Sequence, residues 1–136
     1  MKTLLFMLAA MTTLSCFAQK DVPAAVQESF KKNFPGVTVK KWEKEDGNFE
    51  ANFSKGGKTM SATFDAKGEW METETDIAIS ELPSAVTSYV KEHYSGATIK
   101  EAAMLKTPQG DIYEAEVKGK DLLFDTNGKF LKEEKN

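Results

Sequence analysis

Residues 64–70, Phe-Asp-Ala-Lys-Gly-Glu-Trp, decide the fold, because the chain repeats the pattern at residues 124–130 as Phe-Asp-Thr-Asn-Gly-Lys-Phe. Each copy has an apolar residue that ends a strand, a turn that contains Gly, and an aromatic residue that starts the next strand. Gly suits a turn position where the backbone φ angle becomes positive, and Asn-Gly is a strong hairpin signal. The two copies therefore predict two similar hairpins and, around them, two copies of one structural unit.

The segment that precedes each hairpin also occurs twice. Residues 22–26, Val-Pro-Ala-Ala-Val, correspond to residues 82–86, Leu-Pro-Ser-Ala-Val. Apolar residues then recur every fourth position, which predicts an amphipathic helix that ends at Pro35-Gly36 in the first copy and at Ser95-Gly96 in the second. In the first copy the apolar positions are Val22, Val26, Phe30 and Phe34.

Alternating apolar and polar residues predict four antiparallel strands after each helix. In the first copy we expect them at residues 37–44, 49–53, 59–64 and 70–75. Insertions between the copies fall in turns, as in a true structural repeat. The predicted fold class is α+β: a tandem repeat of a helix plus a four-stranded antiparallel sheet, with both helices on one face. Residues 19–79 and 80–136 would form one compact unit, joined edge to edge or packed as a pseudo-twofold pair, with residues 132–136 fraying.

The composition excludes one class of partner. The chain has 136 residues, a formal net charge of -3 and 18 basic residues, all of them Lys. Proteins that bind nucleic acid usually carry a basic surplus and use Arg to contact phosphates and guanine. We therefore expect no nucleic-acid partner.

Residues 1–18 resemble a secretory signal. Lys2 precedes an apolar run that is too short for a membrane span, and small residues at positions 16 and 18 predict cleavage after Ala18. The alternative is a lipoprotein signal with a lipid on Cys16, against which Thr13 stands where Leu is usual. In either case we expect a periplasmic or secreted protein with no transmembrane segment in the mature chain. Cleavage after Ala18 would also remove the one Cys.

With these motifs aligned, the chain resembles the PepSY-like family, which is related in fold to the β-lactamase-inhibitor protein family. The resemblance covers residues 22–131 and rests on the two Leu/Val-Pro-x-Ala-Val helix starts, the Gly-containing helix ends and the two hairpins. It implies a secreted binding or inhibitory module whose sheet face can contact a protein. The motifs are structural, so they carry no contact residue over to this chain.

No residue pattern predicts a catalytic, cofactor or metal site. His93 is the single His and has no nucleophile or orienting partner nearby in the sequence, so we interpret it as a residue at the border of a helix. Asp125-Thr126-Asn127-Gly128 weakly resembles a calcium loop but lacks the alternating ligands and the closing Glu. The acids of residues 43–50 show no metal-ligand spacing either, and turn formation and solvation explain both stretches.

The remaining candidate is the face of the sheet that the helices do not cover. If Phe49, Ala51 and Phe53 contact the helix, the polar residues between them face water. Trp42, by strand parity opposite to Val39, would lie on this outer face or at an edge of the core, whereas we expect Trp70 to close the core. The candidate partner-binding residues are Trp42, Glu50, Asn52, Trp70, Glu114 and Glu116.

The sequence thus favours an exported, non-enzymatic protein that binds a protein partner through its sheet face or hairpin loops. The alternative is an envelope protein that binds a small ligand or a cation through its acidic turns. An enzyme would require a pocket that contains His93 or paired acids with shifted pKa values.

Overall fold

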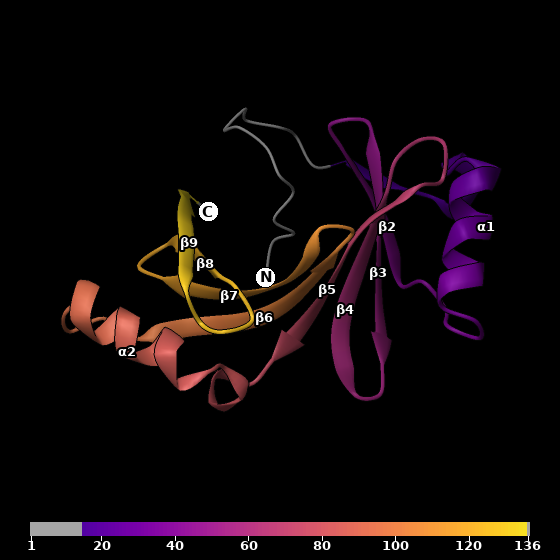
Figure 1. Cartoon of the computed structure of the whole chain (residues 1–136). Helices are drawn as coiled ribbons and strands as arrows, with labels where there is room; N and C mark the ends of the chain where they lie inside the picture. Colours follow the sequence, from indigo (N-terminus) through magenta and orange to yellow (C-terminus); the bar gives the residue numbers. More distant parts are fainter. Residues whose placement is uncertain (1–14, 136) are drawn as a thin grey trace. The chain divides into compact units, whose positions relative to one another are not determined.

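The computed structural model describes residues 15–135, which fold into two compact units (Figure 1). The first unit ends at Thr73 and the second begins at Glu74. Each unit combines one α-helix with antiparallel strands, so the predicted α+β class is confirmed. This boundary falls inside a strand; the expected repeat bounds, residues 19–79 and 80–136, stay predictions. Four strands per repeat, and one compact body for the two repeats, stay predictions.

In the first unit the helix is followed by strands that pair with their neighbours in chain order. Its elements are β1 (Ser15–Phe17), η1 (Gln19–Asp21), α1 (Ala24–Asn33), β2 (Lys41–Glu45), β3 (Asn48–Lys55), β4 (Lys58–Phe64) and the first half of β5 (Trp70–Ile77). The strand β1 pairs with β2 and belongs to the segment that the sequence assigns to a signal. Residues 1–14 of that segment lie outside the described residues, and its cleavage stays a prediction.

The second unit repeats this order. Its elements are the second half of β5, η2 (Ile79–Glu81), α2 (Ser84–His93), β6 (Ile99–Thr107), β7 (Gly110–Val117), β8 (Lys120–Phe124) and β9 (Phe130–Lys135). The expectation that residues 132–136 fray is wrong up to Lys135. This segment pairs with β8, and an ion pair of 2.7 Å between Lys120 and Glu133 links the two strands. Asn136 lies outside the described residues.

Both helices begin at the residue after a proline, two positions later than the apolar pattern starts. The carbonyl oxygen of Pro23 accepts hydrogen bonds from Val26 and Gln27, and that of Pro83 accepts one from Val86. Proline at this position lacks an N–H that the helix would leave without a partner. The first three apolar positions of each stripe are buried as expected, namely Val22, Val26 and Phe30 in the first unit and Leu82, Val86 and Val90 in the second, whereas Phe34 and Tyr94 are half-buried. None of the helices in residues 15–135 is long and apolar enough to cross a membrane.

In each unit the helix packs on one face of the strands and forms the core there. The first core centres on Phe30, whose ring lies 5.1 Å from Phe53, 5.9 Å from Trp42 and 6.4 Å from Phe64. In the second core smaller residues replace some of these rings, because Val90 and Ala102 stand where the first unit has Phe30 and Trp42. We call the strand face that the helix does not cover the outer face of each unit.

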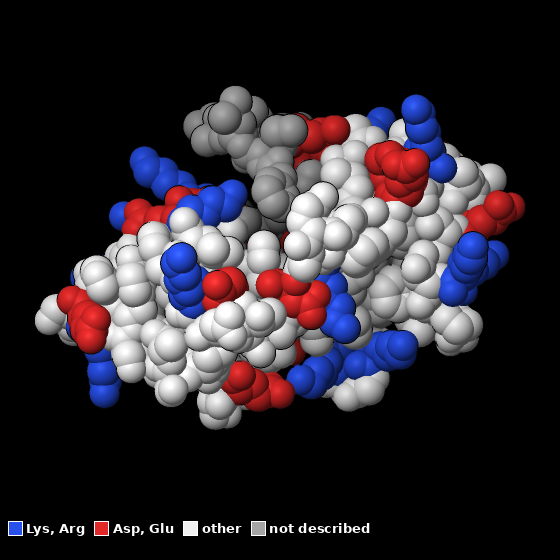
Figure 2. All heavy atoms as spheres, in the orientation of Figure 1, with Lys and Arg blue, Asp and Glu red and all other residues white. Residues whose placement is uncertain are grey.

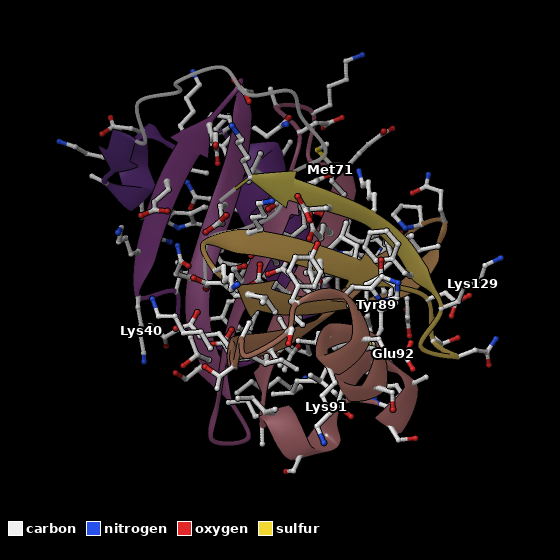
Figure 3. The ribbon with its side chains drawn as sticks, turned by 90° about the vertical axis from the view of Figure 1, so that its left-hand side faces the viewer. Lys40, Met71, Tyr89, Lys91, Glu92 and Lys129 are labelled. Atoms are coloured by element: carbon white, nitrogen blue, oxygen red, sulfur yellow. The ribbon has the colours of Figure 1, made fainter. Side chains whose placement is uncertain are left out.

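Tyr89 joins α2 to the last two strands of the second unit. Its ring stacks on Phe130 with centroids 4.6 Å apart and meets Phe124 edge to face at 5.5 Å. Figure 3 shows Tyr89 between α2 and the strands, whereas Lys91 points away from them. This aromatic packing holds α2 against its strands although the second core has fewer large side chains.

The repeated hairpin motif fixes a tight turn against the start of each helix. The carboxylate of Asp65 accepts hydrogen bonds from the backbone N–H groups of Lys67 (2.9 Å) and Glu69 (3.0 Å), and Asp125 does the same in the second unit. Gly68 has a φ angle of +88°, and a Cβ atom there would lie 2.5 Å from the carbonyl oxygen of Ala25. The glycine therefore serves both the turn and a close contact with α1, of which the sequence indicated only the turn.

Candidate binding face

The outer faces carry the polar residues that the sequence predicted there, but most of these residues are buried. Glu50 and Glu116 are each 8% exposed, Glu114 is fully buried, and Asn52 is half-buried. The expectation that these side chains point to water is therefore wrong for the three glutamates, whereas Asn52 is partly exposed. They lie on the central strands β3 and β7, where side chains of the strands on either side flank them; Glu50, for example, lies between Glu43 and Thr63.

Trp42 does not belong to the outer face. It is 3% exposed, lies opposite the buried Ala51 of β3, and packs against Phe30 in the core. The parity argument from Val39 failed because β2 begins only at Lys41, after a bend at Lys40, so the alternation does not continue from Val39.

Trp70 is half-buried and packs against the core of the first unit. Its indole N–H donates a hydrogen bond of 2.8 Å to the hydroxyl of Thr73. This agrees with the expectation that Trp70 closes the core. With Trp42 buried, the two tryptophans form no exposed recognition patch.

His93 lies at the end of α2 and is exposed. Its ring stacks on Tyr89 at 3.9 Å, and its Nδ1 lies 3.0 Å from the carbonyl oxygen of Tyr89, to which it donates when protonated. These contacts belong to a helix end and bring no acid or nucleophile to the imidazole. Among residues 15–135, moreover, no three His, Cys, Asp or Glu residues are arranged to hold a metal ion.

Four carboxylates form a row across the outer face of the second unit. Glu101 on β6, Glu116 on β7, Asp121 on β8 and Glu134 on β9 are successive cross-strand partners. Side chains directly opposite in antiparallel strands have Cβ atoms about 5 Å apart, and like charges at this distance destabilise the sheet. We call these residues the acidic row. Lysines offset part of the charge: Lys100 lies 3.7 Å from Glu116, and Lys132 forms an ion pair with Glu134.

Asp121 is the most constrained member of the acidic row. It is 2% exposed, and its Oδ1 atom has no hydrogen-bond partner in the described part of the chain. Burial, followed by the negative charges of Glu116 and Glu134, raises the pKa of Asp121 to about 6. A buried carboxylate oxygen without a hydrogen-bond donor costs stability, so this arrangement opposes folding.

The first unit shows that the strand pairing does not require three of these four acids. Its residues at the corresponding register positions are Lys41, Asn52 and Ser61, which pair with one another as Glu101, Glu116 and Asp121 do. The two outer faces therefore differ in charge although their backbones pair in the same way. Hairpin register could have revealed the row from sequence, because the turn at Lys118-Gly119 places Glu116 opposite Asp121.

A shallow depression of about 310 Å³ adjoins the acidic row at Glu101. It lies in the second unit and is lined by Asp76, Ile77, Ala78, Ile79, Lys100, Glu101 and Ala102. Burial raises the pKa of Asp76, and the charge of Glu101 adds to this effect. Acidic and Lys side chains are interspersed over the face seen in Figure 2.

The fold and the outer faces define a small α+β protein with polar strand faces. The chain belongs to the family described as "Putative beta-lactamase-inhibitor-like, PepSY-like", which it matches over residues 11–60 and 47–132. The resemblance seen in the sequence is thus confirmed. The family description names an inhibitor-like protein and no enzyme activity.

Solved structures of Bacteroides proteins share the fold. A BLIP-like protein from Bacteroides fragilis is 29% identical with a TM-score of 0.69, over 82% of this chain and 85% of that chain. A DUF2874 family protein from Bacteroides uniformis is 26% identical with a TM-score of 0.73, over 82% and 87%. A protein from Bacteroides eggerthii, described as periplasmic, is 22% identical with a TM-score of 0.74, over 83% and 88%. No curated protein matches the chain.

Proposed function

We propose that this chain is an exported, non-enzymatic, inhibitor-like module that binds a protein partner through an outer face or through the hairpin loops. The observation that carries the proposal is the outer face of the second unit, where buried carboxylates lie side by side at a cost in stability. Sites that bind partners often keep such unfavourable arrangements. The inhibitor-like family and the BLIP-like relative support a protein as the partner.

Export is supported by the signal-like residues 1–18 and by the periplasmic description of the relative from Bacteroides eggerthii. The mass of the protein recovered from cells tests this part. A mass that corresponds to residues 19–136 would support cleavage after Ala18, and a mass increased by lipid on Cys16 would support the lipoprotein alternative. Recovery of the full-length chain from the cytoplasm would contradict export.

Of the candidate residues, Glu50, Asn52, Glu114 and Glu116 lie on the outer faces; Glu50, Asn52 and Glu116 remain the proposed contacts, whereas Glu114, two positions before Glu116 in the chain, is fully buried. The test is capture of envelope proteins by the tagged protein as the cell exports it, with Glu114→Gln and Glu116→Gln together as the outer-face variant. The control, Glu28→Gln with Glu92→Gln, removes the same charge from the exposed sides of the two helices. One protein that the wild type and the control retain, and that the outer-face variant loses, would support the proposal.

Binding must then be reproduced with the purified partner. Equal retention by the wild type and both variants would show that the outer face does not take part. A cation-binding function, the alternative drawn from the sequence, is favoured only by the acidic row. It predicts that calcium raises the melting temperature of the wild type and not that of the outer-face variant.

A further inference from the structure

The acidic row and the depression beside it form one continuous surface of the second unit. Glu101 belongs to both, since it starts the row on β6 and lines the depression together with Asp76. We propose that this surface binds a basic segment of the protein partner, with one Lys or Arg side chain in the depression. The inference rests on the proposed function and names the chemistry of the partner.

The lining of the depression matches a long cationic side chain. Ile77, Ile79 and Ala102 offer apolar surface, and Ile79 is 40% exposed although it is a large hydrophobic residue. The aliphatic stem of Lys or Arg packs well on such a surface while its charged end contacts carboxylates, here those of Asp76 and Glu101. A cationic side chain there would offset the repulsion between these two carboxylates.

Charge complementarity extends from the depression along the acidic row. Within the acidic row, Asp121 is buried, its Oδ1 has no hydrogen-bond partner among residues 15–135, and its two cross-strand neighbours are both acids. The Lys residue that offsets Glu116 is 73% exposed and 3.7 Å away, so a cation from a partner can replace it at little cost. A basic segment over the row would relieve the repulsion that the free protein carries.

The first unit argues that the acids serve binding and not folding. It has Lys, Asn and Ser at the positions of Glu101, Glu116 and Asp121, with the same strand pairing. The first unit therefore shows that the same strand pairing can form with Lys, Asn and Ser at these three positions. Among residues 15–135, no three acidic or His residues are placed so that they could hold a metal ion. A basic side chain therefore fits this surface better than a metal ion.

The experiment measures binding of a hexa-arginine peptide to the exported protein at low salt, with hexa-citrulline as the neutral probe of the same shape. We expect wild type to bind hexa-arginine and not hexa-citrulline, and affinity to fall as salt is raised. The row variant, Glu101→Lys with Glu116→Asn and Asp121→Ser, should bind at least tenfold more weakly. The control, Glu28→Lys with Glu92→Lys, changes the net charge by the same amount on the helices and should bind within twofold of wild type.

Circular dichroism establishes whether each variant is folded, and the exposed single variant Glu101→Lys tests the surface if the triple variant is not. Equal losses in row variant and control would show only non-specific attraction and would overturn the inference. Absence of hexa-arginine binding, or calcium binding that the row variant abolishes, would overturn it as well. The proposed function would survive these results if the partner captured through the outer face were recognised by other contacts.

Discussion

Replacing Gly68 by Ala should destabilise the first unit far more than the loss of a turn glycine usually does. Gly68 has a φ angle of +88°, which L residues rarely adopt. An added Cβ atom would also lie 2.5 Å from the carbonyl oxygen and 2.9 Å from the carbonyl carbon of Ala25. These atoms belong to the backbone of α1, so no side-chain rotation can relieve the contact.

The two costs can be separated in magnitude. The left-handed conformation costs an L residue about 1–2 kcal/mol, and forcing an extra carbon into a packed contact costs about 1–3 kcal/mol. Together they predict that Gly68→Ala lowers the free energy of unfolding by about 2–5 kcal/mol. Gly47→Ala is the matched control, because Gly47 has a φ angle of +80° in the same unit but no atom within 4 Å of the added Cβ. It should cost only about 1–2 kcal/mol.

Urea unfolding followed by tryptophan fluorescence measures this difference. Trp42 and Trp70, the two tryptophans of the chain, both lie in the first unit, so the signal reports on the unit that contains Gly68. The midpoint for Gly68→Ala should be clearly lower than that for Gly47→Ala, with similar slopes. Equal midpoints would refute the argument that the hairpin needs Gly68 for its approach to α1.

Three further predictions follow from buried or hydrogen-bonded side chains. The folded-state pKa of Asp121 is raised to about 6, so ionisation of Asp121 above this pH opposes folding. Asp121→Asn should therefore raise the free energy of unfolding by at most about 3 kcal/mol at pH 7.5 and by less at pH 4.5. Urea unfolding at both pH values measures this difference. A gain that does not depend on pH would contradict this. The hydrogen bond from Tyr94 to Glu133 raises the pKa of Tyr94 to about 12. Ultraviolet titration should therefore find one tyrosine with this pKa, and Glu133→Gln should return the pKa of Tyr94 towards 10. An unchanged pKa in the variant would contradict the hydrogen bond. Trp42→Ala should lower the free energy of unfolding by about 3–5 kcal/mol, as for other buried aromatic residues. Trp70→Ala should lower it by less, because Trp70 is only half-buried. A larger drop in melting temperature for Trp70→Ala than for Trp42→Ala would contradict the burial of Trp42.

The sequence predicted the elements well where local rules govern them. The two Asp-x-x-Gly turns and the Pro-x-Ala-Val helix starts depend on a few neighbouring residues, and both copies formed as expected. Trp42 was misplaced because its orientation depends on the bend at Lys40, which alternation alone does not indicate. The charged residues 132–135 were expected to fray but pair with β8. Their own residues do not indicate this order, because it depends on a partner strand elsewhere in the chain.

The acidic row shows a different limit. Strand parity placed Glu116 on the outer face correctly, but it gives no information about what flanks a side chain. The pairing of Glu116 with Asp121 could have been inferred from the short turn at Lys118-Gly119, whereas the pairing of Asp121 with Glu134 required β9 to be recognised as a strand. Asp121 is 2% exposed, and residue spacing alone does not predict this burial.

The strand β1 gives the proposed removal of residues 1–18 a structural consequence. Its three residues occupy one edge of β2, and cleavage after Ala18 would remove them. The N–H and C=O groups of β2 on that edge would then lack hydrogen-bond partners, the condition under which a sheet accepts a strand from another molecule. Lys41 and Lys44 in β2 are exposed charges of the kind that discourage such addition. Cleavage would thus leave β2 as an edge strand that only charged side chains protect from pairing with another molecule. Neutralising these two lysines should make the processed protein self-associate while the precursor stays monomeric.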